Sequence, residues 1–310
     1  MIVDRSRVDL QFQLKHLRVS NQSLKGKLLA FENIAKLWRY EKRVARRSQN
    51  QIVCGPDDAA FVRKHVRRKT AVTVIPNGVD LDFFYPKQSE VRNGIPTIIF
   101  CGAMDYLPNA DAIHWYFEGI HERILHSIPN LEVLIVGRGG DSTIEAYDAL
   151  PEVTVTRSVE DVRPYYRKSW LQIVPLRIAG GTSLKIIESL SIGTPVVSTT
   201  IGAQGLNLKN GEDILLADSK EEFADRVIDA LSSPILRSHL QTNGIFRARE
   251  EYSWNTISRR LNAVYTNPSN SANDRIRLLD LPFDRLSMKG AFVRISEMVD
   301  AGVPSQNRHG

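Results

Sequence analysis

The chain has 310 residues, of which 42% are apolar and 25% charged, and its formal net charge is +6. This is an ordinary globular composition, and the length favours about two domains. The sequence has no run of about 18 apolar residues that could span a bilayer. Its first ten residues mix charged and apolar positions instead of forming the core of a signal peptide. We therefore expect a cytoplasmic protein without a membrane span.

The positive charge is concentrated at the front of the chain. Residues 1–70 carry 17 Lys and Arg against 6 Asp and Glu, whereas the remainder is net negative. Within residues 23–47, apolar side chains such as Leu28, Phe31 and Trp38 recur at helical spacing with basic residues between them. The pattern predicts a basic amphipathic helix that faces an anionic membrane surface or an acidic partner. The alternative is a solvated face on a helix packed against neighbouring structure, and we expect no nucleic-acid partner.

The two cysteines, Cys54 and Cys101, each follow a short apolar stretch. Neither has a partner at a spacing typical of metal ligands. We expect two buried free thiols and no metal site.

Further along the chain, "AVTVIPNG" predicts a strand that runs into a turn at Pro76, Asn77 and Gly78. From there, short apolar runs alternate with helical patterns. Strands are expected at 97–102, 131–137, 152–156, 170–176, 194–199 and 212–217. Helices are expected at 109–128, capped by Asn109, and at 159–169, 183–192, 219–233 and 234–265. Near-continuous apolar strands separated by helices are typical of a parallel sheet covered on both faces. We predict an α/β fold with a Rossmann-like domain at 71–265, a mainly helical part at 1–70 and a loosely ordered tail at 266–310.

The stretch "AGGTSLKIIE" predicts an anion site between a strand and a helix. Gly180 and Gly181 let an anion approach the backbone, and the first free amides of the helix point toward it. We expect Thr182 to cap this helix, with Lys185 adding a positive charge. Glu188, one turn further on, can accept hydrogen bonds from the hydroxyls of a ribose. The alternatives are a simple tight turn and an exposed ion pair between Lys185 and Glu188.

Several stretches together make the chain similar to a known family. They are "VIPNGVDLDFF", "FCGAMDYLPNADA", "LEVLIVGRG", "VTRSVEDVRPYY" and "PLRIAGGTSLKIIESLSIGTPVVST". In this order they resemble the retaining GT-B glycosyltransferases of the "glycosyl transferases group 1" type, in particular bacterial sugar transferases of exopolysaccharide systems. The resemblance covers residues from about 20 to 265. It implies a metal-independent enzyme without a cofactor that transfers a sugar from a nucleoside-diphosphate sugar to a glycan or a lipid-linked acceptor.

The resemblance also implies roles for particular residues. The diphosphate would lie on the amides of Gly181, Thr182, Ser183 and Leu184, with Lys185 beside it and Glu188 on the ribose. The backbone near Ser158 and Val159 would read the base. Gly102 would let the donor approach the sheet edge, and Asp105 and Asn109 would line the same cleft. No catalytic residue is assigned.

The chain also departs from the family pattern. Where many members have Arg and Lys after the strand that matches "TIIFCG", this chain has Ala103, Met104 and Asp105. The 70 residues at the front resemble only the last part of the family's acceptor-binding domain, so we expect most of that domain to be missing and transfer by this chain alone to be poor. Two alternatives stay open: a nucleotide-binding fragment with impaired catalysis, and a GT-B-shaped epimerase of a sugar nucleotide.

Overall fold

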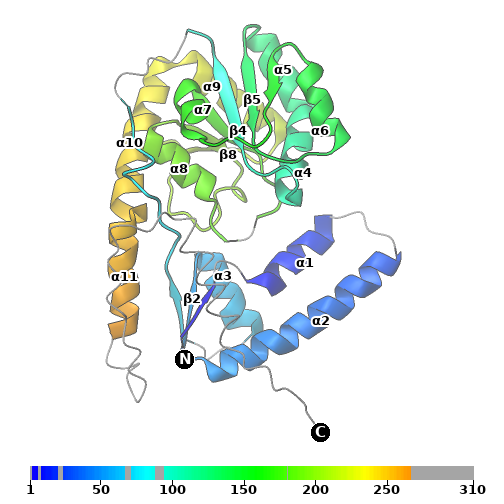
Figure 1. Ribbon diagram of the computed structural model, residues 1–310, viewed down its shortest axis with the longest axis vertical. Coiled ribbons are helices and arrows are strands. Elements are labelled where there is room, and N and C mark those ends of the chain that lie inside the picture. Colours follow the sequence, from blue (N-terminus) through cyan, green and yellow to red (C-terminus); the bar gives the residue numbers. More distant parts are fainter. Residues whose placement is uncertain are drawn as a thin grey trace. The chain divides into compact units, whose positions relative to one another are not determined.

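The computed structural model of the chain describes residues 2–5, 8–19, 24–66, 71–87, 94–179 and 181–266. The segment from Met1 to Thr266 forms one compact unit that holds two parallel sheets (Figure 1). Except for its first residue, the tail that the sequence predicts to be loosely ordered lies outside the described residues.

The first sheet has three parallel strands in the order β1-β2-β3. The strands are β1 (Ile2–Arg5), β2 (Asn50–Val53) and β3 (Ala71–Val74). The helical elements between them are α1 (Asp9–Val19), α2 (Leu24–Arg47), α3 (Pro56–Phe61) and η1 (Val62–Val66). The described residues before position 71 thus form four helical elements and two strands. Its sheet is completed by β3, which the sequence assigns to the Rossmann-like domain, so the division at residue 70 stays a prediction.

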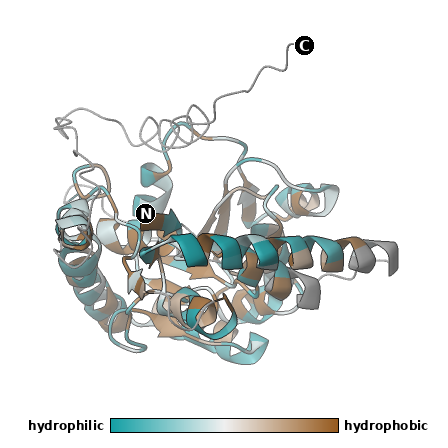
Figure 2. Cartoon of the chain, turned by 90° about the horizontal axis from the view of Figure 1, so that it is seen from below, coloured by the Kyte–Doolittle hydropathy of each residue, from teal (hydrophilic) through white to brown (hydrophobic). Residues whose placement is uncertain are grey.

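Helix α2 confirms the basic helix predicted at 23–47. One face of it packs against the first sheet and its helices through Ile34, Leu37 and Ala45. Glu41 is also on this face, where it is buried and paired with Arg5 of β1. Because the spacing of these residues follows the helical period, the opposite face of α2 is left to its basic residues. Hydrophilic and hydrophobic residues alternate along α2 (Figure 2).

The second sheet has six parallel strands in the order β6-β5-β4-β7-β8-β9. The strands are β4 (Thr97–Cys101), β5 (Glu132–Val136), β6 (Val153–Val155), β7 (Leu171–Val174), β8 (Val196–Ser198) and β9 (Leu215–Leu216). Each lies within an apolar run that the sequence predicts as a strand, so the predicted parallel sheet is confirmed.

Both faces of this sheet are covered, which explains the continuous apolar runs. In β4, Ile98 and Phe100 belong to one apolar cluster, whereas Ile99 and Cys101 belong to another. Successive side chains of a strand point to opposite faces, so a strand buried on both faces carries apolar residues at nearly every position. Cys54 and Cys101 are buried free thiols, as predicted.

Helices follow the strands of the second sheet and cover it, except for the last one, which packs on the first sheet, where Ile257 lies against Ile52 and Ile75. They are α4 (Leu107–Phe117), α5 (Ile120–Ser127), α6 (Ser142–Ala146), η2 (Tyr147–Ala149), α7 (Arg163–Lys168), α8 (Leu184–Ile192), α9 (Lys220–Ser232), α10 (Pro234–Tyr252) and α11 (Trp254–Thr266). Helix α5 lies against α9, and α8 lies against α7 and α10.

Two details of the predicted helices are wrong. The helix expected at 109–128 is two helices, interrupted at Glu118 and Gly119, and Tyr106 stands at the N-cap position instead of Asn109. Pro108 lies in the first turn, where its missing N–H costs nothing, so the helix begins earlier than the asparagine suggests. At α8, Ser183 is the N-cap and not Thr182. The side chain of Thr182 is engaged elsewhere, by Asn77.

Candidate functional site

The second sheet has a switch point between β4 and β7. From β4 the chain continues to β5 and β6 on one side, and from β7 to β8 and β9 on the other. In open parallel sheets, ligands bind outside the carboxyl ends of the strands at such a point. The segments there are the one from Gly102 to Asp105, after β4, and the one from residue 175 to Ser183, after β7. The candidate site therefore lies where the sequence places the glycine-rich turn.

Lys185 is the central cation of this site. It is the second residue of α8 and is partly buried. Its ammonium donates a hydrogen bond to Asn109 Oδ1 at 2.7 Å and lies 4.3 Å from the centre of the Phe100 ring. Burial lowers the pKa of Lys185 to about 8. The nearby Glu188 offsets only part of this effect of burial, so the Lys185 ammonium would be stabilised by an anionic ligand.

Gly102 makes room for this arrangement. A Cβ at this position would lie 2.8 Å from Lys185 Nζ and 2.7 Å from Asn109 Nδ2. The Asn109 amide also donates to the carbonyl of Ala103 at 2.8 Å, so it connects the segment after β4 to Lys185. The structure thus brings Gly102, Lys185 and Asn109 together at the end of β4. Whether Gly102 also contacts a donor stays a prediction.

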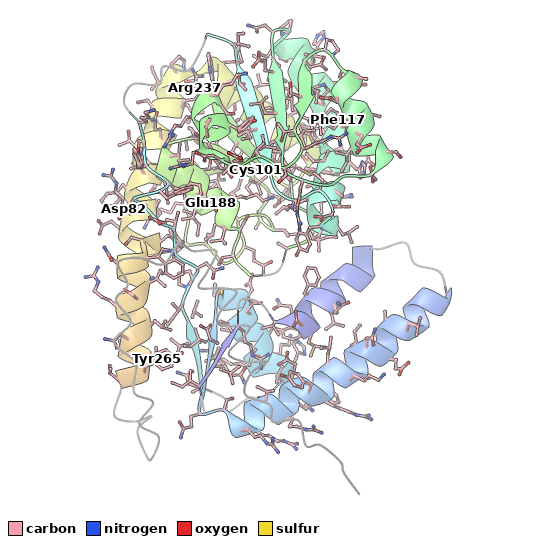
Figure 3. The ribbon with its side chains drawn as sticks, viewed as in Figure 1. Asp82, Cys101, Phe117, Glu188, Arg237 and Tyr265 are labelled. Carbon is pink, nitrogen blue, oxygen red and sulfur yellow. The ribbon has the colours of Figure 1, made fainter. Side chains whose placement is uncertain are left out.

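Glu188 lies one turn after Lys185 on α8, near Cys101 at the end of β4 (Figure 3). Burial raises the pKa of Glu188 to about 7, and the nearby Lys185 opposes that rise. Burial also raises the pKa of the Cys101 thiol, which therefore stays protonated. Among the described residues, none forms a hydrogen bond or an ion pair with the Glu188 carboxylate. The alternative of an exposed Lys185–Glu188 ion pair is therefore not what the structure contains.

The glycine-rich turn precedes α8. Gly181 has a φ of 72°, which only glycine adopts readily, while Gly180 lies outside the described residues. Thr182 is buried, Ser183 is partly buried and Leu184 is 39% exposed. The predicted anion-binding residues from Gly181 to Lys185 therefore form one turn that leads into a helix of nine residues. The amides in the first turn of a helix have no partner within the helix and are available to an anion.

The predicted base-reading residues lie at the same edge of the sheet, two strands away. Ser158 and Val159 follow β6, whose neighbour β5 pairs with β4. Ser158 is exposed, and Val159 is partly buried against the apolar cluster that contains Cys101. Their role stays a prediction.

Two contacts near the site were not predicted from the sequence. Asn77, in the turn after β3, donates a hydrogen bond to Thr182 Oγ1 at 2.8 Å. Asp105, predicted to line the cleft, is exposed and lies 3.5 Å from Arg138. The Pro-Asn-Gly pattern predicts the turn that contains Asn77, but it does not predict the contact of Asn77 with Thr182.

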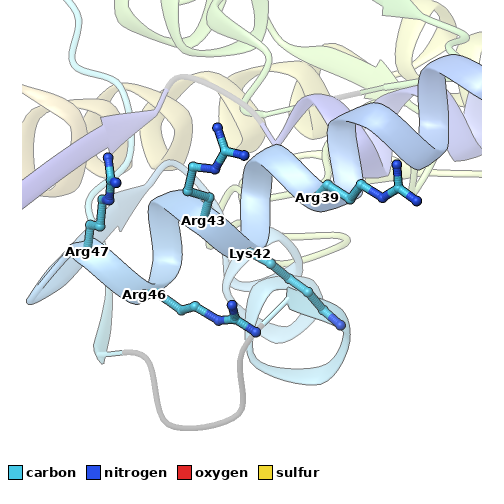
Figure 4. Close-up of a pocket in the computed structure, with 5 residues that line it drawn as sticks. All are labelled: Arg39, Lys42, Arg43, Arg46 and Arg47. Atoms are coloured by element: carbon cyan, nitrogen blue, oxygen red, sulfur yellow. The ribbon is translucent and has the colours of Figure 1, made fainter.

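A second cluster of charge lies on the outward face of α2. Five basic side chains there line a surface hollow (Figure 4): Arg39, Lys42, Arg43, Arg46 and Arg47. The same helix exposes large apolar side chains, with Phe31 at 61% and Trp38 at 43% exposure, and the Lys42 ammonium lies 3.5 Å from the centre of the Trp38 ring. In the described part of the chain, no helix is long and apolar enough to cross a membrane.

Comparison with known proteins gives one family match. The profile of the family described as "Glycosyl transferases group 1" matches residues 95–233, which span the second sheet from just before β4 to the end of α9. Among curated proteins, the chain is 24% identical over 140 residues to "Uncharacterized 44.6 kDa protein in cps region" of Klebsiella pneumoniae, covering 43% of this chain and 36% of that protein. It is 24% identical over 224 residues to D-inositol 3-phosphate glycosyltransferase of Nocardiopsis dassonvillei, covering 65% and 52%. The chain thus spans about half or less of the length of these relatives.

Solved structures share the fold. Sucrose-phosphate synthase from Thermosynechococcus elongatus matches with a TM-score of 0.63 at 20% identity, over 85% of this chain and 66% of that one. Anabaena Alr3699/HepE, in complex with UDP and glucose, matches with a TM-score of 0.63 at 14% identity, over 86% and 71%. Because the sequence identity is low, these matches show only a shared fold, which is of the GT-B type.

Proposed function

We propose that this chain, which belongs to the glycosyl transferases group 1 family, binds a nucleoside-diphosphate sugar at the switch point between β4 and β7 and transfers the sugar to an acceptor. The observation that carries the proposal is the partly buried Lys185 at the start of α8, next to the amides from Gly181 to Leu184, which donate to no backbone carbonyl among the described residues. A diphosphate would provide a negatively charged partner for the Lys185 ammonium.

Each part of the donor would have its own partner. The amides from Gly181 to Leu184 and the Lys185 ammonium would hold the diphosphate, while the Glu188 carboxylate would accept hydrogen bonds from the ribose hydroxyls. The backbone near Ser158 and Val159 would contact the base. These assignments are supported by the shared position of the residues at the carboxyl edge of the sheet.

The same groups would promote the transfer step. The acceptor oxygen bonds to the anomeric carbon, the acceptor proton passes to the released diphosphate, and the bond between that carbon and the diphosphate oxygen breaks. Negative charge then accumulates on the departing diphosphate. Preorganised amides and the Lys185 cation would stabilise that charge, which is a large source of rate enhancement. We propose that the reaction proceeds with retention and without a metal.

Calorimetric titration with UDP and GDP tests the donor site. We expect one of the two to bind with a dissociation constant below about 1 mM and the corresponding nucleoside monophosphate to bind more weakly. Lys185→Met should weaken this binding. Lys209→Met is its matched control, because Lys209 is exposed and forms an i,i+3 ion pair with Glu212. A folded protein that binds neither diphosphate below this limit would refute the proposal.

The acceptor and the cellular location are further parts of the proposal. We propose a glycan or lipid-linked acceptor of the exopolysaccharide type and a cytoplasmic location at the inner membrane face, with α2 in contact with the lipid surface. The five basic side chains and the exposed Phe31 and Trp38 support such contact, since interfacial helices combine cations with aromatic residues. An acidic protein partner is the competing occupant.

Vesicle sedimentation tests the contact of α2. We expect binding to vesicles rich in anionic phospholipid, little binding to neutral vesicles, and a loss of binding in Arg39→Glu/Arg43→Glu. Arg226→Glu/Arg259→Glu, on exposed faces of α9 and α11, makes the same change in charge elsewhere and should bind as the wild type does. Equal loss in both double variants would argue against a specific role of α2.

A further inference from the structure

The phosphate turn is held by a residue far away in the sequence. Asn77 lies 105 positions before Thr182, and its amide donates to Thr182 Oγ1 at 2.8 Å. The segment around Asn77 is itself fixed: the amide of Val79 donates to the carbonyl of Tyr252 at 2.7 Å, and the ring of Trp254 packs against Gly78. Asn77 therefore presents its side chain to the turn from a well-held position.

The Asn77 amide has a second neighbour besides Thr182, the thiol of Cys54. The Cys54 thiol lies 3.4 Å from Asn77 Oδ1 and also 3.4 Å from the carbonyl of Arg5. Burial raises the pKa of this thiol to about 12, so it is a donor at physiological pH. In the structure the amide oxygen faces Cys54, whose one hydrogen can go to that oxygen or to the carbonyl of Arg5, and the NH₂ group faces Thr182.

This orientation decides what the Thr182 hydroxyl can do. A hydroxyl has one hydrogen to donate, and the Asn77 NH₂ group occupies a lone pair of Oγ1, so that hydrogen must point elsewhere. The methyl group of Thr182 lies against Gly205, where a Cβ would come within 3.0 Å of it, which restricts rotation of the side chain. Among the described residues, none accepts a hydrogen bond from this hydroxyl.

We infer that Asn77 is a positioning residue for the donor site: it directs the Thr182 hydroxyl to donate its hydrogen bond to a phosphate oxygen of the nucleotide. The inference rests on the proposed function, because the acceptor is the diphosphate of the proposed donor. In this arrangement both the hydroxyl and the backbone amide of Thr182 donate hydrogen bonds to the diphosphate. It also makes the affinity of the phosphate turn depend on a residue that follows the first sheet.

A double-mutant cycle on nucleotide affinity tests the inference, with Asn77→Ala, Thr182→Val and the combined variant. Calorimetry uses whichever of UDP or GDP the wild type binds. Each single change should weaken binding about 10-fold, the usual effect of losing a hydrogen bond to a charged group. The combined variant should be little worse than either single one, because both remove the same bond. Thr182→Ser, which keeps the hydroxyl, should retain most of the affinity.

Two controls separate positioning from a general structural role. Asn255→Ala, at an exposed position on α11, should leave the affinity unchanged. The affinity for the nucleoside without phosphates, followed by ligand-observed NMR, should be the same in Asn77→Ala and the wild type, whereas a structural collapse of the site would lower it.

The outcomes are distinguishable. Fully additive losses, or Thr182→Ser as weak as Thr182→Val, would overturn the role of Asn77 while leaving the donor site intact. A wild-type protein that binds neither diphosphate would overturn both proposals. Thermal melting of each variant without ligand shows whether it is folded. If Asn77→Ala does not fold, the comparison of Thr182→Ser with Thr182→Val decides the role of the hydroxyl.

Discussion

Lys185→Met should make the unliganded protein more stable while it weakens nucleotide binding. Burial lowers the pKa of Lys185 from 10.5 to about 8, which corresponds to about 3 kcal/mol against the charged form at neutral pH. The variant leaves Asn109 Oδ1 without its donor, at a cost of about 1 to 2 kcal/mol. A net gain of about 1 kcal/mol remains, and for a unit of this size that raises the melting temperature by about 3 °C.

The pH dependence gives this prediction a sign that can be checked. Below pH 8 the lysine is protonated in both the folded and the unfolded chain, so the full penalty acts on the wild type. As the pH rises above about 8, the folded protein loses this proton first, and the penalty disappears toward pH 10.5. The stability advantage of Lys185→Met should therefore be largest below pH 8 and shrink above it.

Differential scanning calorimetry and nucleotide titration on the same samples provide the assay. Lys209→Met is the matched control, because its ammonium is exposed and should change neither quantity by more than a small amount. A variant that melts lower than the wild type and still binds the nucleotide equally well would refute the reasoning, since Lys185 would then be a structural residue.

Three further results are expected. Glu188→Ala should weaken nucleotide binding by about 1 to 3 kcal/mol and leave the affinity for pyrophosphate unchanged, because only the ribose loses a partner; an equal loss for both ligands would contradict this. The pKa of Glu188 is about 7, so wild-type affinity for the nucleotide relative to pyrophosphate should fall as the pH drops through 7, and a pH titration of Glu188→Ala should show no such fall. Gly102→Ala should lower nucleotide affinity with little change in melting temperature, because the added methyl displaces only the flexible end of Lys185 and the amide of Asn109; an unchanged affinity would show that this contact is dispensable.

The strands of the second sheet could be predicted from the sequence because local composition determines them. A strand buried on both faces is apolar at nearly every position, as β4 is from Ile98 to Cys101, and that pattern is visible without a structure. The first sheet is harder to recognise. Its strand β1 has only four residues, which is too short for a clear pattern. It pairs with β2 across 48 positions of the chain, and no local pattern indicates such a distant contact.

The candidate site shows the same contrast. Lys185 and Glu188 share one helix, so their spacing already places them near each other. Asn77 and Asn109 reach the site from 105 and 76 positions away, and only the folded chain brings them there. Asn109 also shows how a local rule can mislead. The sequence suggests a helix cap, but the folded chain uses this side chain to bind Lys185 and the carbonyl of Ala103.

The central claim is that a nucleoside diphosphate binds at the turn before α8, and amide hydrogen exchange with and without UDP or GDP locates the binding most directly. We expect saturating ligand to slow exchange at the amides from Gly181 to Lys185, with little change along α2. Protection confined to the basic face of α2, or no protection at the turn while the nucleotide is bound, would contradict the account.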